Sequence, residues 1–250
     1  NYDAGIFNVD FKNNPELARE KINTWVEDET QGKIKDLIPP NAITEFTRLI
    51  LANAIYFKGS WLSSFNKNLT QQGDFWTLSE SQISVDMMKS LGNKFNYVQD
   101  GNIEAILLPY LSRDFAMTII LPKQGAFLSV EKELSTDLID TLLGKMQPEN
   151  VDLVMPKFDY ETTINANDIL KSLGMELAFN PEKSDFSGMS EEDRLYITDV
   201  LQKATITVDE EGTEAAAATA IIMGVKSMPI QEEPITLVID RPFLFFISHL

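Results

Sequence analysis

Apolar and polar positions alternate with two different periods, and the first fifty residues show both. Phe7, Val9 and Phe11 are separated by polar residues, which predicts a short strand. Pro15, preceded by an asparagine and followed by a glutamate, suits the first position of a helix. Apolar residues then recur at helical spacing, so we expect a helix that begins at Pro15 and ends before Gly32.

The rest of the chain continues these patterns, and no Gly-, Ser- or Pro-rich linker divides it. Residues 49–57 form a nearly continuous apolar run rich in β-formers, which suits a strand buried on both faces. Residues 128–143 repeat their apolar side chains every three or four positions, as a helix does. We also expect strands at 83–88, 103–108, 115–121, 151–155 and 195–208, and a helix at 168–173. Because strands dominate and helices are interspersed irregularly, the pattern predicts an α+β fold in a single domain, residues 1–250.

The composition narrows the chemistry that this chain can perform. Its 250 residues include 21 basic and 38 acidic side chains, which gives a net charge of -17. We therefore expect this acidic chain to bind neither nucleic acid nor an anionic membrane surface, because both are negatively charged as well. No apolar stretch is long enough to span a membrane. There is no cysteine, and the one histidine is His249, so we expect no metal site and no cofactor. A hydrolase would need His249 as an imidazole base or a pair of carboxylates. No nucleophile elbow is present and no spacing singles out an acidic pair, so we expect no enzyme.

Residues 210–234 combine a composition typical of a helix with a sequence context typical of a strand or loop. Their alanine-rich run favours a short helix by composition, but it follows a strand directly and continues into β-branched residues and prolines. If the run is a strand, Gly212 provides a permissive pivot before it. One face of that strand carries small uncharged side chains over its leading half, namely Thr213, Ala215, Ala217 and Thr219. Such a segment can serve either as an exposed loop or as a strand inserted into a sheet.

Three motifs resemble those of the serpin family of serine protease inhibitors, and they occur in the family's order. Residues 53–61, Asn-Ala-Ile-Tyr-Phe-Lys-Gly-Ser-Trp, resemble a strand of the central sheet and the turn after it. Residues 240–247, Asp-Arg-Pro-Phe-Leu-Phe-Phe-Ile, resemble the C-terminal signature. The third motif is similar to the hinge of an inhibitory serpin and comprises Glu211, Gly212, Thr213, Glu214, Ala215, Ala216, Ala217, Ala218 and Thr219.

The resemblance implies the serpin fold, with large mixed β-sheets, surrounding helices and an exposed reactive loop at about residues 210–234. It also implies that the chain is incomplete against the family. The N-terminal helices, a strand of the main sheet and the last C-terminal strand have no counterpart in these 250 residues.

The resemblance further implies inhibition by a suicide mechanism, in which a protease cleaves the loop and the hinge then inserts into the sheet. Family spacing places the reactive bond between Lys226 and Ser227, although Lys226 can also be an ordinary solvated loop lysine. A lysine fits the acidic pocket of a trypsin-like serine protease, which is therefore the expected partner of a monomeric inhibitor. The alternative is a non-inhibitory serpin that acts as a carrier, chaperone or storage protein.

Five residues match family positions near the point where the loop enters the sheet, namely Asn53, Trp61, Lys157, Gln202 and Glu210. Core packing is the alternative role for Trp61, and separate surface charges are the alternative to an ion pair between Lys157 and Glu210. Gln202 stands where the family commonly has a histidine. Glutamine can still hydrogen-bond to Asn53, but it cannot titrate.

Sequence features that bear on the cellular compartment are consistent with a secreted protein and with a cytoplasmic one. Asn68 begins an N-glycosylation sequon, Asn-Leu-Thr, which favours secretion. The absence of cysteine fits both an extracellular and a cytoplasmic protein.

Overall fold

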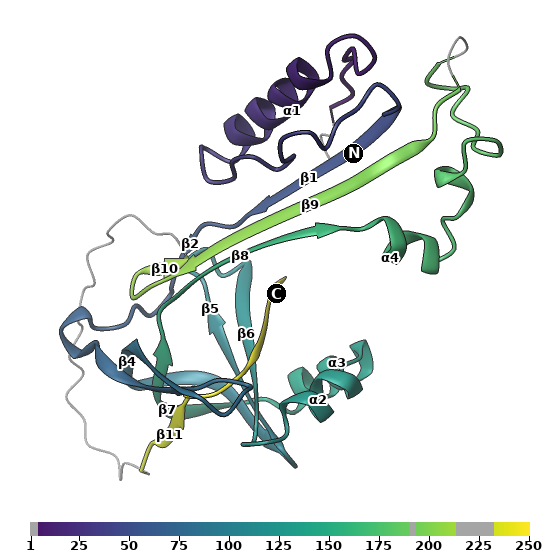
Figure 1. Cartoon of the computed structure of the whole chain (residues 1–250). Helices are drawn as coiled ribbons and strands as arrows, with labels where there is room; N and C mark the ends of the chain where they lie inside the picture. Colours follow the sequence, from purple (N-terminus) through teal and green to yellow (C-terminus); the bar gives the residue numbers. More distant parts are fainter. Residues whose placement is uncertain (1–4, 191–193, 214–232) are drawn as a thin grey trace. The chain divides into compact units, whose positions relative to one another are not determined.

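The computed structural model describes residues 5–190, 194–213 and 233–250 (Figure 1). The chain divides into two compact units. The first comprises Asn1–Phe57 and Tyr160–Ile206, and the second comprises Lys58–Asp159 and Thr207–Leu250. The single domain expected from the sequence stays a prediction.

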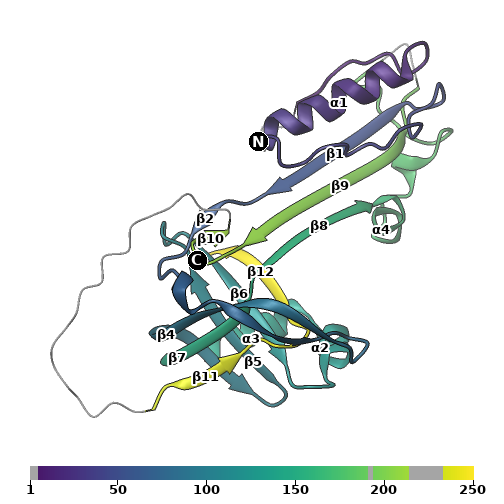
Figure 2. The ribbon, with the colours of Figure 1, turned by 60° about the vertical axis from the view of Figure 1, so that its left-hand side comes forward.

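The first unit is built on strands that pair along β9. Its elements are α1 (Pro15–Glu29), β1 (Leu49–Tyr56), α4 (Asn167–Ser172), η2 (Leu177–Phe179) and most of β8 (Phe158–Asn165) and β9 (Ile197–Val208). β1 runs parallel to β9 from the pair Leu49–Ile197 to the pair Tyr56–Thr205, and β8 also pairs with β9. Helix α1 lies along β1 and β9 in Figures 1 and 2. The core beneath it is formed by Val26, Ile34, Leu37, Ile38 and Ile43.

The second unit contains a seven-stranded sheet in the order β11-β7-β4-β5-β6-β12, with β3 paired to β4. Its elements are β2 (Gly59–Ser60), η1 (Lys67–Leu69), β3 (Gln71–Trp76), β4 (Gln82–Asp100), β5 (Ile103–Pro109), β6 (Phe115–Pro122), α2 (Phe127–Glu133), α3 (Thr136–Lys145), β7 (Gln147–Pro156), β10 (Gly212–Thr213), β11 (Ile235–Val238) and β12 (Leu244–His249). Helices α2 and α3 pack on this sheet through a buried cluster that includes Val130 and Leu142 (Figure 2). The α+β class predicted from the sequence is confirmed.

Two sequence predictions about the first unit are wrong. Residues 7–11 form no strand, because Asp10 accepts hydrogen bonds from Asn13 in a local turn and Phe7 packs against the ring of Trp25 instead of pairing with a strand. β1 is not buried on both faces. One face packs on the core under α1, whereas Leu51 and Ile55 on the other face are exposed.

Two further differences concern element boundaries. The helix predicted at 128–143 is two helices, α2 and α3, because Ser135 lies in an extended conformation and its side chain accepts a hydrogen bond from the backbone nitrogen of Leu138. The strand predicted at 83–88 is the first part of a strand of 19 residues, β4. Strands β3, β8 and β11 were not predicted from the sequence.

Candidate functional site

The candidate site lies in the second unit, where the chain reverses direction between β9 and β10. The backbone nitrogen of Asp209 donates to the carbonyl oxygen of Gly212 at 2.9 Å. The Asp209 carboxylate accepts from the backbone nitrogens of Glu211 at 2.8 Å and Gly212 at 3.2 Å. A Cβ atom added to Gly212 would lie 2.1 Å from the carbonyl oxygen of Gly59, so the position requires glycine.

Thr213, the residue after this turn, is completely buried. It pairs with Val208 of β9 on one side and with Gly59 of β2 on the other. Its hydroxyl group lies 2.8 Å from that of Tyr110 and shares a hydrogen bond with it. Burial raises the pKa of Tyr110, so this phenol is protonated at neutral pH and can take part as donor or acceptor. Within the predicted hinge, Thr213 therefore lies in a strand, β10, with a partner on each side.

Trp61 packs in the core and also contacts the turn at 209–212. Its ring is buried and stacks on Tyr110, with 4.7 Å between the ring centroids and 13° between the planes. The indole nitrogen donates to the carbonyl oxygen of Asp209 at 3.0 Å. The backbone nitrogen of Trp61 donates to the carbonyl oxygen of Glu211 at 2.9 Å. The residue packs in the core and also holds the turn in place.

Glu210 is buried and forms an ion pair with Lys157, whose Nζ lies 2.9 Å from the Glu210 Oε2. Its other carboxylate oxygen accepts a hydrogen bond of 2.6 Å from the hydroxyl group of Thr70. Burial raises the pKa of Glu210, but the hydrogen bonds from Thr70 and Lys157 outweigh this effect and hold it below its ordinary value. The carboxylate is therefore charged at neutral pH.

Asn53 and Gln202 lie in the first unit, opposite each other in the register of β1 and β9. Asn53 is exposed and Gln202 is half-buried. No side-chain hydrogen bond joins these two described residues, although their positions are adjacent.

Residues 214–232 of the predicted loop lie outside the described residues. This applies to the reactive bond, Lys226 and Ser227, and to six hinge residues, Glu214, Ala215, Ala216, Ala217, Ala218 and Thr219. Asn68 is described, and it lies exposed in η1.

Three residues of the site were missed by sequence reasoning, namely Lys67, Thr70 and Tyr110. Thr70 and Tyr110 contact the turn or the hinge across more than a hundred residues of chain. No local pattern distinguishes such a threonine or tyrosine from others, so only the three-dimensional structure identifies them.

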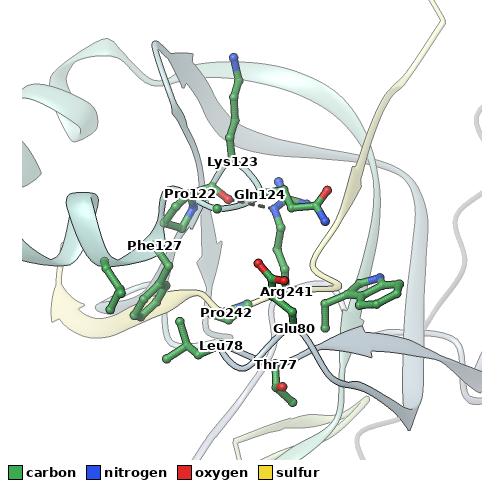
Figure 3. A pocket seen from close by; sticks show the side chains of 12 residues that line it. Thr77, Leu78, Glu80, Pro122, Lys123, Gln124, Phe127, Arg241 and Pro242 are labelled. Atoms are coloured by element: carbon green, nitrogen blue, oxygen red, sulfur yellow. Dashed lines mark hydrogen bonds between the residues drawn. The ribbon is translucent and has the colours of Figure 1, made fainter.

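A surface hollow of about 490 Å³ lies elsewhere in the second unit. It is lined by the β3–β4 turn, the start of α2 and Arg241, which Figure 3 shows among the lining side chains. The Arg241 Nε donates to the carbonyl oxygen of Pro122 at 2.9 Å, and its guanidinium group also pairs with Asp240. None of the residues predicted from the sequence to act in the loop mechanism lines this hollow.

Neither a membrane-spanning helix nor a metal-binding cluster occurs in the part of the chain that the structure describes. None of the helices there combines the length and apolar character needed to cross a membrane. Groups of three or more His, Asp or Glu side chains able to hold a metal ion are also not found in those residues.

The family model for serpins, described as serine protease inhibitors, matches residues 1–250. The chain therefore belongs to the serpin family. An uncharacterized serpin-like protein of Thermococcus kodakarensis is 41% identical over 96% of this chain and 55% of its own length. The leukocyte elastase inhibitor of Xenopus tropicalis is 37% identical over 99% of this chain and 66% of its own length. The chain thus spans between about half and two thirds of these relatives.

Solved serpin structures show the same fold. Serpin48 of the insect Tenebrio molitor, described as a highly specific serpin, matches with a TM-score of 0.85 and 33% identity over 97% of this chain and 64% of its own. Thyroxine-binding globulin in complex with thyroxine matches with a TM-score of 0.86 and 28% identity over 99% of this chain and 64% of its own. The serpin fold implied by the sequence motifs is confirmed.

Proposed function

We propose that this protein inhibits a trypsin-like serine protease by a suicide mechanism. The protease serine attacks the carbonyl carbon of Lys226, the peptide bond to Ser227 breaks, and Ser227 leaves with a free amino group. The new ester bond ties the protease to Lys226. Insertion of the hinge into the main sheet then carries the protease away and distorts its active site before water can release it.

The burial and pairing of Thr213 carry this proposal. A strand that begins with partners on both sides can be extended residue by residue, provided that its next inward side chains are small and uncharged. The sequence meets this condition at Ala215, Ala217 and Thr219. Residues 212–226 can span roughly 50 Å as a strand at about 3.3 Å per residue, which is enough to carry a protease across a domain.

A non-inhibitory role is the second candidate. One structural neighbour, thyroxine-binding globulin, is seen in complex with a small molecule, whereas the Xenopus relative is named as an elastase inhibitor. The small uncharged residues Ala215, Ala217 and Thr219 favour inhibition, because bulky or charged side chains at these positions would block insertion.

Incubation of the protein with trypsin tests the proposal. We expect a covalent complex that survives boiling in SDS, with mass spectrometry showing cleavage after Lys226. Lys226→Leu should abolish complex formation with trypsin. Cleavage of the wild-type protein without any stable complex would contradict the proposal and favour the carrier role.

Two hinge variants test the insertion step. Ala217→Arg places a charge on the inward face and should convert the inhibitor into a substrate. Ala216→Arg places the same charge on the opposite face of the strand and should leave inhibition largely intact. The pair is preferable to a change at Thr213, because an arginine at that buried position can unfold the site. Equal behaviour of the two variants would show that the loop does not insert as a strand.

We further propose that the protein is secreted and carries a glycan on Asn68, which is exposed. Digestion of protein from its native source with an N-glycosidase should lower its apparent mass. An unchanged mass would favour the cytoplasmic alternative.

A further inference from the structure

Residues 61–70 hold the turn at 209–212 along its whole length. Backbone nitrogens of this segment donate to carbonyl oxygens of the turn, from Trp61 to Glu211 at 2.9 Å and from Phe65 to Glu210 at 2.8 Å. The last residue of the segment, Thr70, donates to the Glu210 carboxylate. The turn in which the predicted hinge begins is thus held by one continuous segment of chain.

Two lysines from different elements each bind one glutamate of this turn. Lys157, which follows β7, binds the buried Glu210. Lys67, in η1, binds Glu211. The Lys67 side chain is 62% exposed, but that of Glu211 is only 21% exposed. The hydrogen bond to Glu211 raises the pKa of Lys67, so the lysine carries its charge at every pH at which the protein would be assayed.

Glu211 is held at three points before any loop movement starts. Its backbone nitrogen donates to the Asp209 carboxylate, its carbonyl oxygen accepts from Trp61, and its carboxylate binds Lys67. The next two residues, Gly212 and Thr213, are already paired with Ser60 and Gly59 of β2. A residue held at backbone and side chain thus directly precedes the paired strand β10.

We propose that Lys67 is a positioning residue for loop insertion, because its ion pair with Glu211 anchors the residue before β10 and confines the movement to the residues after Thr213. The inference rests on the proposed inhibitory function. When the cleaved loop enters the sheet, the moving chain exerts a force on Glu211, which the ion pair with Lys67 holds in place. If Glu211 yields, insertion slows while release of the protease by water continues at its own rate. A larger share of encounters then ends in hydrolysis of the loop.

The measurable consequence is the number of inhibitor molecules consumed for each protease molecule trapped. We expect Lys67→Met and Glu211→Gln each to raise the ratio of hydrolysed inhibitor to trapped protease about twofold at low salt. This change corresponds to about 0.4 kcal/mol, at 1.36 kcal/mol per tenfold change in rate. At 1 M salt the effect should be smaller, because salt screens the exposed Lys67 charge while the contacting hydrogen bond remains. The exchanged pair Lys67→Glu with Glu211→Lys should recover the wild-type value.

Lys94→Met is the matched control, since Lys94 is an exposed lysine of β4 in the same unit. It should leave the consumption ratio unchanged. The inference is overturned if the wild-type protein traps trypsin and Lys67→Met consumes no more inhibitor than Lys94→Met. It is also overturned if Lys67→Met lowers the melting temperature while the consumption ratio stays constant, because the role is then purely structural. A wild-type protein that never traps trypsin refutes the proposed function instead.

Discussion

Replacement of Lys157 by methionine removes the cation that faces Glu210 and keeps a side chain of similar length. The Glu210 side chain is 6% exposed and that of Lys157 is 37% exposed, so only one member of the pair is buried. Exposed ion pairs contribute about 0.2–1 kcal/mol, and removal of one partner from a fully buried pair costs about 3–5 kcal/mol. We therefore expect Lys157→Met to lower the free energy of unfolding by about 2 kcal/mol at pH 7.

The pH dependence provides a second test of the same pair. The pKa of Glu210 is lowered in the folded protein from its ordinary value of 4.5, so its carboxylate stabilises the fold above that value. This stabilisation is lost as the pH falls through the folded-state pKa. The difference between wild type and Lys157→Met should thus be largest at neutral pH and should shrink at acidic pH.

Urea unfolding followed by tryptophan fluorescence at pH 7 and at pH 4 measures both effects, with the slope against urea compared between variants. Lys145→Met is the matched control. It removes an ion pair of 2.5 Å with Asp100 in which both side chains are exposed, and it should cost no more than about 0.5 kcal/mol. The reasoning is refuted if Lys157→Met costs no more than Lys145→Met, or if its cost is the same at both pH values.

Two further substitutions test the turn and the core. Gly212→Ala should destabilise the protein by about 1–3 kcal/mol, because the new Cβ would lie 2.1 Å from a carbonyl oxygen of β2, whereas Gly188→Ala, which meets no atom within 4 Å, should cost less than about 0.5 kcal/mol. Leu142→Ala should lower the free energy of unfolding by about 2–5 kcal/mol, measured by thermal or urea unfolding, since Leu142 of α3 is fully buried in the core. The exposed Leu128→Ala provides the comparison. Equal effects within either pair of variants would contradict the packing described above.

Local periodicity predicted the elements whose identity depends on their own residues. The helix expected to begin at Pro15 does begin there, and strands were predicted correctly where β5 and β6 are found. The wrong and missed elements depend on a partner. Residues 7–11 alternate as a strand does but lie beside a helix, and β8 forms because β9 offers an edge.

The candidate site also has some features that follow from local sequence and others that depend on distant residues. Motifs in the sequence were sufficient to identify the family, because they are carried by consecutive residues, and the position of the hinge stays a prediction from the same motifs. The anchoring of the turn was not predictable in this way. Thr70 and Glu210 are 140 positions apart, and Trp61 and Asp209 are 148 positions apart.

The sequence by itself determined that the chain is an α+β serpin with a glycine pivot and a run of small residues after it. Only the tertiary structure decided that Thr213 is already paired on both sides and that Lys157 and Lys67 hold the two preceding glutamates. The physical reason is that backbone preferences act between near neighbours in the chain. Ion pairs and buried hydrogen bonds instead depend on which distant segments the folded sheet brings together.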